Sequence, residues 1–156
     1  MRSGFERTAA IILAAAVLLL AGGALGESTE IILPDGQHRL TLPEGMEYQE
    51  PAEDEKDLKG IFLMPPDLEM LVFAYDAGQA TVQDLAEAMT NAGLNAQLRE
   101  VGGETMLVFQ DQDPADQAPC LGYSYVKDGI MVEISFFYSS QGAMDLTESI
   151  MESIHQ

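Results

Sequence analysis

The stretch LGYSYVKDGIMVEISFFY, residues 121–138, decides the fold of this sequence. Two runs rich in aromatic and β-branched side chains flank Asp128-Gly129, a dipeptide that tolerates the two positive φ angles of a type I′ turn. A two-residue turn fixes the register of the hairpin, so the apolar side chains meet on one face: Tyr125 opposite Val132, Tyr123 opposite Ile134, and Leu121 opposite Phe136. We therefore expect this face to belong to the core of an antiparallel sheet.

The opposite face of the same hairpin is polar, because Ser124 pairs with Glu133 and Gly122 pairs with Ser135. A carboxylate in the middle of a strand is normally avoided under full cover, so either this face is open or Glu133 is paired. An open face would form a shallow polar groove, which makes Ser124, Glu133 and Ser135 the candidate ligand-binding residues. The alternative is a plain solvated face.

Further hairpins are predicted upstream. Residues 96–101 and 104–110 surround Gly102-Gly103, which places Leu98 opposite Leu107 and Ala96 opposite Phe109. Residues 30–33 and 38–42 flank a Pro-Asp-Gly-Gln turn, and residues 60–64 and 69–75 flank a Pro-Pro-Asp turn. These segments add the remaining strands.

Two helices complete the pattern. Thr81 is a suitable N-cap with Asp84 three residues later, and Gly93 supplies the left-handed residue that ends a helix over residues 81–92. Residues 141–155 place apolar side chains on one side and acidic ones on another, which predicts a second, amphipathic helix. The predicted fold class is α+β: an antiparallel sheet of about six to eight strands with two helices packed on it, as an αβα sandwich.

The first 26 residues have the features of a cleavable signal peptide. Arg2 and Arg7 precede the apolar run 9–25, and small residues stand at the end of that run, before Glu27. The alternative is an N-terminal membrane anchor, but 17 residues span only about 25 Å, less than the roughly 30 Å of a bilayer core. We expect cleavage near Gly26, a single domain over residues 27–156, and export to the periplasm, the cell envelope or the medium.

The charge balance narrows the choice of partner. The chain has 7 basic and 26 acidic residues; removing Arg2, Arg7 and Glu6 leaves 5 and 25, a net charge of −20. Nucleic acids and anionic membrane surfaces both attract Lys and Arg, so neither is an expected partner. A partner should be basic, apolar or a cation, although acidic surfaces also serve solubility alone.

Few residues suggest catalysis or metal binding. The two histidines, His38 and His155, are interpreted as incidental, and Cys120 as a small buried residue at the start of a strand. The acidic motif at 111–116 lacks the Gly and the final Glu of an EF-hand loop, and the acidic run 50–57 should attract divalent cations only weakly. We predict no catalytic residues, no metal site and no cofactor.

The segment HRLTLPEGM, residues 38–46, resembles the opening of domains with the PsbP-like fold. This fold is named for an extrinsic subunit of photosystem II and is shared with a Ran-binding nuclear protein. The helix at 81–92, the Asp-Gly hairpin and the final ESIMESI, residues 148–154, extend the resemblance over most of residues 28–155. It implies an exported bacterial protein of unknown role, and no functional residue is carried over from the photosynthetic or Ran-binding members.

The resulting functional prediction is an exported, non-catalytic binding or accessory module, with another envelope or secreted protein as its partner. The alternatives are a small exported hydrolase with an unrecognised site, and a weak divalent-cation binder. A deep pocket with convergent polar groups would favour the enzyme, whereas an exposed apolar patch or groove would favour the binding module.

Overall fold

The computed structural model describes residues 28–112 and 117–156. The predicted signal peptide therefore lies outside the described residues, as do Asp113 and Asp116 of the acidic motif. None of the helices in the described part is both long and apolar enough to cross a membrane.

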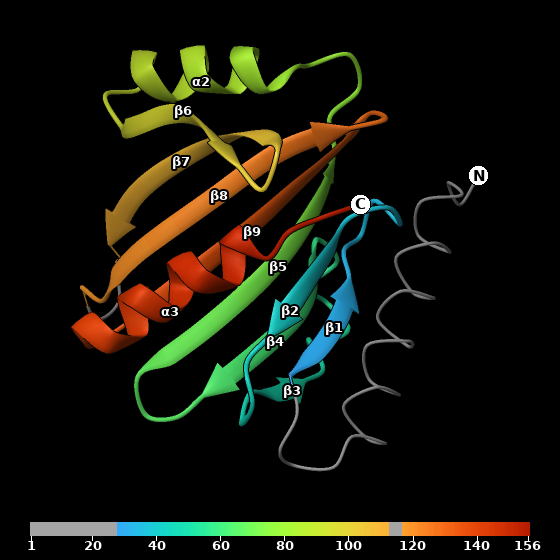
Figure 1. Cartoon of the computed structure of the whole chain (residues 1–156). Helices are drawn as coiled ribbons and strands as arrows, with labels where there is room; N and C mark the ends of the chain where they lie inside the picture. The colour runs from blue at the N-terminus through green and yellow to red at the C-terminus, as the bar shows by residue number, and fades with distance from the viewer. Residues whose placement is uncertain (1–27, 113–116) are drawn as a thin grey trace.

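Seven antiparallel strands form the main sheet (Figure 1). Their order across the sheet is β3-β4-β5-β9-β8-β7-β6. The strands are β3 (Glu47–Gln49), β4 (Leu58–Met64), β5 (Leu68–Asp76), β6 (Asn95–Val101), β7 (Glu104–Gln112), β8 (Pro119–Lys127) and β9 (Ile130–Tyr138). The α+β class is confirmed, and the short edge strand β3 is an addition that the sequence pattern did not predict.

The two hairpins with two-residue turns have the predicted registers. In β8–β9, Tyr125 pairs with Val132 and Ser124 pairs with Glu133. In β6–β7, Leu98 pairs with Leu107. Asp128 and Gly129 both have positive φ, at 50° and 78°, as a type I′ turn requires.

The first hairpin forms a separate two-stranded sheet, β1 (Thr29–Ile32) with β2 (Arg39–Leu42). It lies on the same side of the main sheet as the C-terminal helix (Figure 1). The alternating residues Leu40 and Leu42 are fully buried, and they join the central strands in one hydrophobic core. The hairpin thus covers part of the sheet instead of extending it.

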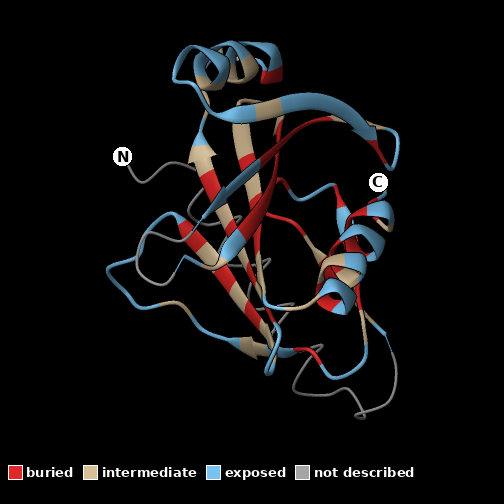
Figure 2. Cartoon of the chain, turned by 90° about the vertical axis from the view of Figure 1, so that its left-hand side faces the viewer, coloured by how far each residue is buried: buried red, intermediate tan, exposed pale blue. Residues whose placement is uncertain are grey.

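Helix α2 (Val82–Asn91) begins as predicted. The Asp84 amide donates to the Thr81 hydroxyl (3.2 Å), and the Thr81 amide donates to the Asp84 carboxylate (2.7 Å), which completes a capping box. The helix packs against β6, β7 and β8, and Val82 is its one buried residue. The other residues of α2 are half-buried or exposed (Figure 2).

Helix α3 (Gln141–Glu152) ends three residues earlier than predicted. The Ser153 hydroxyl donates to the Ile150 carbonyl (2.6 Å) and accepts from the Thr41 amide (2.9 Å), so it connects the end of the helix to β2. His155 then pairs with Arg39 as an isolated bridge. A tertiary contact with the hairpin therefore ends the helix, and periodicity alone does not show such a contact.

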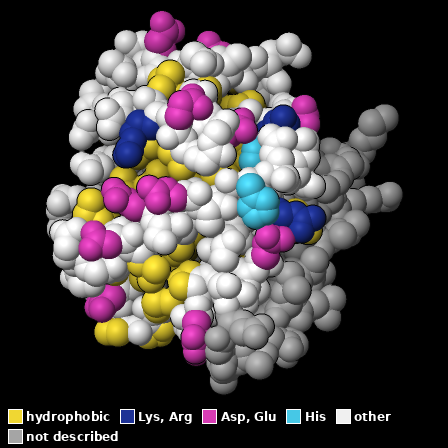
Figure 3. All heavy atoms as spheres, viewed as in Figure 1, with side chains coloured by type: hydrophobic (Ala, Val, Ile, Leu, Met, Phe, Trp, Pro, Cys, Tyr) yellow, Lys and Arg dark blue, Asp and Glu magenta, His cyan; other side chains and the backbone are white. Residues whose placement is uncertain are grey.

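The two helices lie on opposite faces of the main sheet, as an αβα sandwich requires. Helix α3 packs against β9 and β2, on the face where Tyr125, Ile134 and Phe136 are fully buried. Acidic side chains are spread over the surface on this side, whereas Lys and Arg are few (Figure 3). Helix α2 covers only the β6–β8 part of the other face.

Candidate functional site

The three predicted ligand-binding residues lie on the sheet face away from α3, but they do not form a polar groove. Ser124 and Ser135 are buried, with 3% and 4% of their surface exposed, and only Glu133 is half-buried. The structure thus corrects the expectation that this face would present hydroxyl groups to a ligand.

Packing explains the small residues in this part of β8 and β9. A Cβ atom added to Gly122 would lie 2.0 Å from the Phe109 ring, so the ring occupies the space over that glycine. Phe109 and Leu107 are buried on the same face, opposite Gly122 and Ser124 in the neighbouring strand. The small side chains therefore make room for large ones beneath α2.

The remainder of this face, over β4, β5 and β9, is apolar and has no described helix packed on it. Alternation along the strands and the registers between them place these side chains on one side. We call it the open face; its half-buried residues are Ile61, Leu63, Glu69, Leu71, Phe73, Tyr75, Met131, Glu133 and Phe137.

Two aromatic rings and one carboxylate stand at the centre of the open face. The Phe73 and Tyr75 rings are stacked, with centroids 6.1 Å apart and planes inclined by 8°. Glu133 is the direct neighbour of Phe73 on the adjacent strand. The Ser135 hydroxyl donates to Glu133 Oε1 (3.0 Å), and no described Lys, Arg or His forms an ion pair with this carboxylate.

The surroundings of Glu133 and Tyr75 disfavour the charged forms of both side chains. Burial raises the pKa of Glu133, although the hydrogen bond from Ser135 acts in the opposite direction. Burial, with the nearby carboxylates of Glu133 and Asp57, raises the pKa of Tyr75 to about 12. The open face therefore holds a partly desolvated carboxylate that forms no ion pair with a described residue.

Glu133→Gln is expected to raise the melting temperature at pH 7. A carboxyl group whose pKa is raised by folding contributes stability below its unfolded pKa of about 4.3, and loses it as the pH rises through the folded value. Glutamine removes the ionised form, so the gain should shrink as the pH falls towards 4. Thermal melts from pH 4 to 8 measure this; Glu87→Gln, on an exposed part of α2, is the control, and an equal gain there would contradict the argument.

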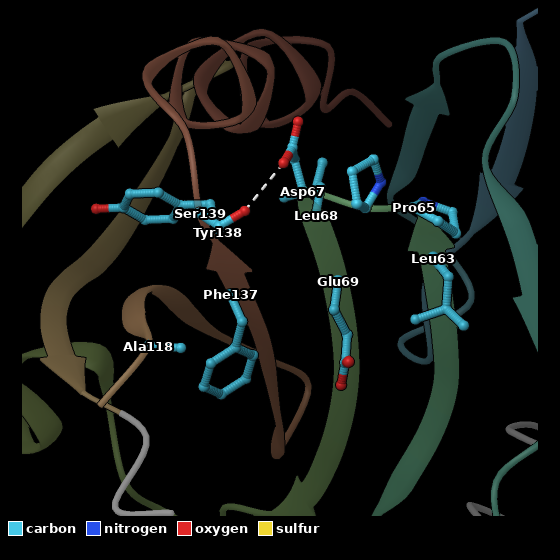
Figure 4. Close-up of a pocket in the computed structure, with 10 residues that line it drawn as sticks. Leu63, Pro65, Asp67, Leu68, Glu69, Ala118, Phe137, Tyr138 and Ser139 are labelled. Atoms are coloured by element: carbon cyan, nitrogen blue, oxygen red, sulfur yellow. Dashed lines mark hydrogen bonds between the residues drawn. The ribbon is translucent and has the colours of Figure 1, made fainter. Parts of the chain in front are cut away.

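A cavity of about 320 Å³ lies at one end of the open face (Figure 4). The Ser139 hydroxyl donates to the Asp67 carboxylate (3.0 Å) beside it, and Pro65-Pro66, joined by a cis peptide bond, forms part of its wall. The lining is mostly apolar with two carboxylates: Leu63, Pro65, Pro66, Asp67, Leu68, Glu69, Ala118, Phe137, Tyr138 and Ser139. The cavity therefore extends the open face, and both surfaces are mostly apolar with a few carboxylates.

A second cluster, centred on His38, is buried on the other side of the sheet. His38 Nδ1 contacts the Asp35 carboxylate, and Nε2 lies 3.0 Å from Glu104 Oε2 and 3.2 Å from the Gln156 side-chain nitrogen. Asp35 also accepts from the Tyr125 hydroxyl (3.1 Å) and from the backbone amide of His38 (3.0 Å). Burial, followed by the charge of Asp35, raises the pKa of Tyr125.

His38 therefore has a structural role that the sequence analysis did not predict. An Asp–His pair suits acid–base catalysis, but the His38 side chain is 2% exposed and its outer nitrogen already contacts two side chains. The cluster instead connects the β1–β2 turn to β7, β8 and the C-terminus. One signal could have revealed it: His38 alternates with Leu40 and Leu42 along the strand, which places it on the buried face.

The remaining candidates are Cys120 and the acidic run 50–57. Cys120 is buried in β8, with 6% of its surface exposed, and residues 52–57 are exposed. Within residues 28–112 and 117–156, no group of three or more His, Cys, Asp or Glu side chains is placed to hold a metal ion. The weak, non-specific cation binding expected of the acidic run stays a prediction.

Solved structures resemble this chain in fold. They include cyanobacterial PsbP (CyanoP) from Synechocystis sp. PCC 6803, with a TM-score of 0.63 and 12% identity over 86% of this chain and 95% of that one. LpqN, involved in cell envelope biogenesis of Mycobacterium tuberculosis, gives a TM-score of 0.54 and 11% identity over 82% and 89% of the two chains. A protein of Bacteroides thetaiotaomicron gives 0.60 and 14% identity over 81% of this chain, which spans 47% of that protein's length.

Neither a protein-family model nor a curated protein matches the sequence. At 11–14% identity, the structural likeness shows the fold alone. The PsbP-like fold expected from HRLTLPEGM and the final helix is confirmed, and any ligand has to be argued from the chain's own surfaces.

Proposed function

We propose that this PsbP-like domain is an exported, non-catalytic binding module of the cell envelope, and that the open face is the surface that binds its partner protein. The observation that carries the proposal is the set of half-buried aromatic and aliphatic side chains over β4, β5 and β9 with no described helix on them. Contiguous apolar surface of this kind marks interaction sites in soluble proteins.

Three further features support the proposal. The first 26 residues match a signal peptide, and LpqN, a neighbour in fold, is a protein of cell envelope biogenesis. The net charge of −20 for residues 27–156 disfavours nucleic acid and anionic lipid as partners. The inaccessible Asp35–His38 pair makes a hydrolase the weaker alternative.

Site-specific photo-crosslinking in the producing cells tests this function. A benzophenone amino acid placed at Phe73 or Phe137, both on the open face, should yield a discrete product of higher mass in the exported fraction. The same group at Glu87 on α2 or Glu152 on α3, both exposed, should not. Equal crosslinking at all four positions, or none at Phe73 and Phe137, would contradict a binding role for this face. A product of twice the chain's mass would identify the occupant as a second copy and reject an accessory role towards another protein.

A further inference from the structure

The aromatic pair and the carboxylate on the open face together have the chemistry of a site for an organic cation. Phe73 and Tyr75 hold their rings parallel on one strand, and Glu133 lies directly across from Phe73 on the next. Cations bind over the faces of aromatic rings, and the attraction strengthens when the site is partly desolvated. A half-buried carboxylate adds a hydrogen-bond acceptor of opposite charge.

Among the described residues, no Lys, Arg or His forms an ion pair with Glu133. Lys59, on the neighbouring strand β4, donates to the Lys56 carbonyl, and Arg39 is paired with Glu30 on the other side of the molecule. Only five basic residues accompany 25 acidic ones after residue 26. A half-buried carboxylate is costly without a positive partner, and the surrounding negative charge attracts a cationic partner.

We infer that the open face binds an arginine side chain of an exported partner protein, with the guanidinium between the Phe73–Tyr75 rings and the Glu133 carboxylate. Arginine suits the site better than lysine because its planar guanidinium stacks on aromatic rings, bonds a carboxylate through two N–H groups, and is more weakly hydrated. The inference rests on the proposed binding role of the open face and names the partner's chemistry there.

The test uses the protein purified from the exported fraction and labelled with ¹⁵N. Nα-acetyl-arginine methylamide is titrated while backbone amide shifts are recorded, and its neutral analogue, Nα-acetyl-citrulline methylamide, is the matched probe. We expect saturable shifts centred on Phe73, Tyr75 and Glu133, with an affinity for the arginine probe at least fivefold above that for the citrulline probe. The lysine analogue should bind more weakly than the arginine probe.

Two variants make the test specific to the proposed groups. Glu133→Gln keeps the side-chain shape and should remove the preference for arginine over citrulline, whereas Glu87→Gln on α2 should leave it unchanged. Phe73→Leu keeps an apolar side chain without a ring and should weaken the arginine probe more than the lysine probe. All titrations are run at low and at high salt, because diffuse attraction to an acidic surface disappears with salt.

Several results would overturn the inference: equal affinities for arginine and citrulline, shifts spread over the acidic surface, or equal losses in Glu133→Gln and Glu87→Gln. Failure of this inference can be distinguished from failure of the proposed function. If Phe73 and Phe137 crosslink to a partner but the arginine probe shows no preference, the open face is a binding surface whose partner is not held through arginine.

Discussion

Replacing His38 with alanine is expected to lower the free energy of unfolding by about 3 kcal/mol, because it removes the ring that joins Asp35 to Glu104. Asp35 would keep its hydrogen bonds from the Tyr125 hydroxyl and the backbone amides but lose the imidazole ring of His38, and Asp35 itself is only 8% exposed. For a domain of this size we expect the melting temperature to fall by roughly 10 °C.

The matched control is His155→Ala, because His155 is exposed and its ring lies 3.2 Å from Glu30 at the surface. Loss of such a surface pair should cost less than about 1 kcal/mol. A double-mutant cycle of Asp35→Asn with His38→Ala then measures how strongly the two side chains depend on one another. If His38→Ala and His155→Ala melted alike, or the two changes at 35 and 38 were additive, the cluster would not stabilise the fold as argued.

The sequence correctly predicted those features that depend on residues close together in the chain. The turns at Asp128-Gly129 and Gly102-Gly103 fix the register of their hairpins, so a two-residue loop determines every pair along the strands. The capping box at Thr81 depends on neighbours three residues apart and was equally predictable. The pairing of β5 with β9 joins strands that lie far apart in the chain, and no turn specifies it.

The features that the sequence did not predict are either too short to show a pattern or depend on contacts between distant segments. Strand β3 is three residues long, too short for an alternating pattern, and the early end of α3 depends on a contact between Ser153 and Thr41. In the candidate site, Glu133 could be singled out because a carboxylate in mid-strand is unusual. Its aromatic neighbours Phe73 and Tyr75 lie on β5, which only the long-range pairing places beside it.

Asp35 illustrates how local chemistry can hide a tertiary role. In Pro-Asp-Gly-Gln an aspartate is expected to accept hydrogen bonds from the turn's own backbone, and it does so from the amides of Gln37 and His38. Its second oxygen contacts the His38 ring and the Tyr125 hydroxyl, 90 residues away. The hydrogen bonds within the turn can be predicted from the turn sequence. The contact with Tyr125 can be predicted only when the position of β8 is known.

Gly102→Ala is expected to destabilise the protein by about 2–4 kcal/mol, through backbone strain and a steric clash. Gly102 has φ +57°, a conformation that alanine adopts only with strain. A Cβ atom there would lie 2.3 Å from Ile154 Cγ2 and 2.5 Å from the Ile154 carbonyl oxygen. Ile154 is a buried core residue, so the C-terminal segment cannot move away without losing packing.

Gly103 provides a control for that prediction within the same turn. It has φ +85°, yet a Cβ atom there would have nothing within 4 Å, so Gly103→Ala should cost only the backbone strain of about 1–2 kcal/mol. The difference between the two variants in chemical denaturation isolates the contact between the β6–β7 turn and residue 154. Since Gln156 and Glu104 both reach His38 from these segments, Gly102→Ala should also weaken the His38 cluster. The cost of His38→Ala should then be smaller in the Gly102→Ala background than in the unmodified chain. Equal stabilities of the two glycine variants would show that the C-terminus is not packed closely against this turn.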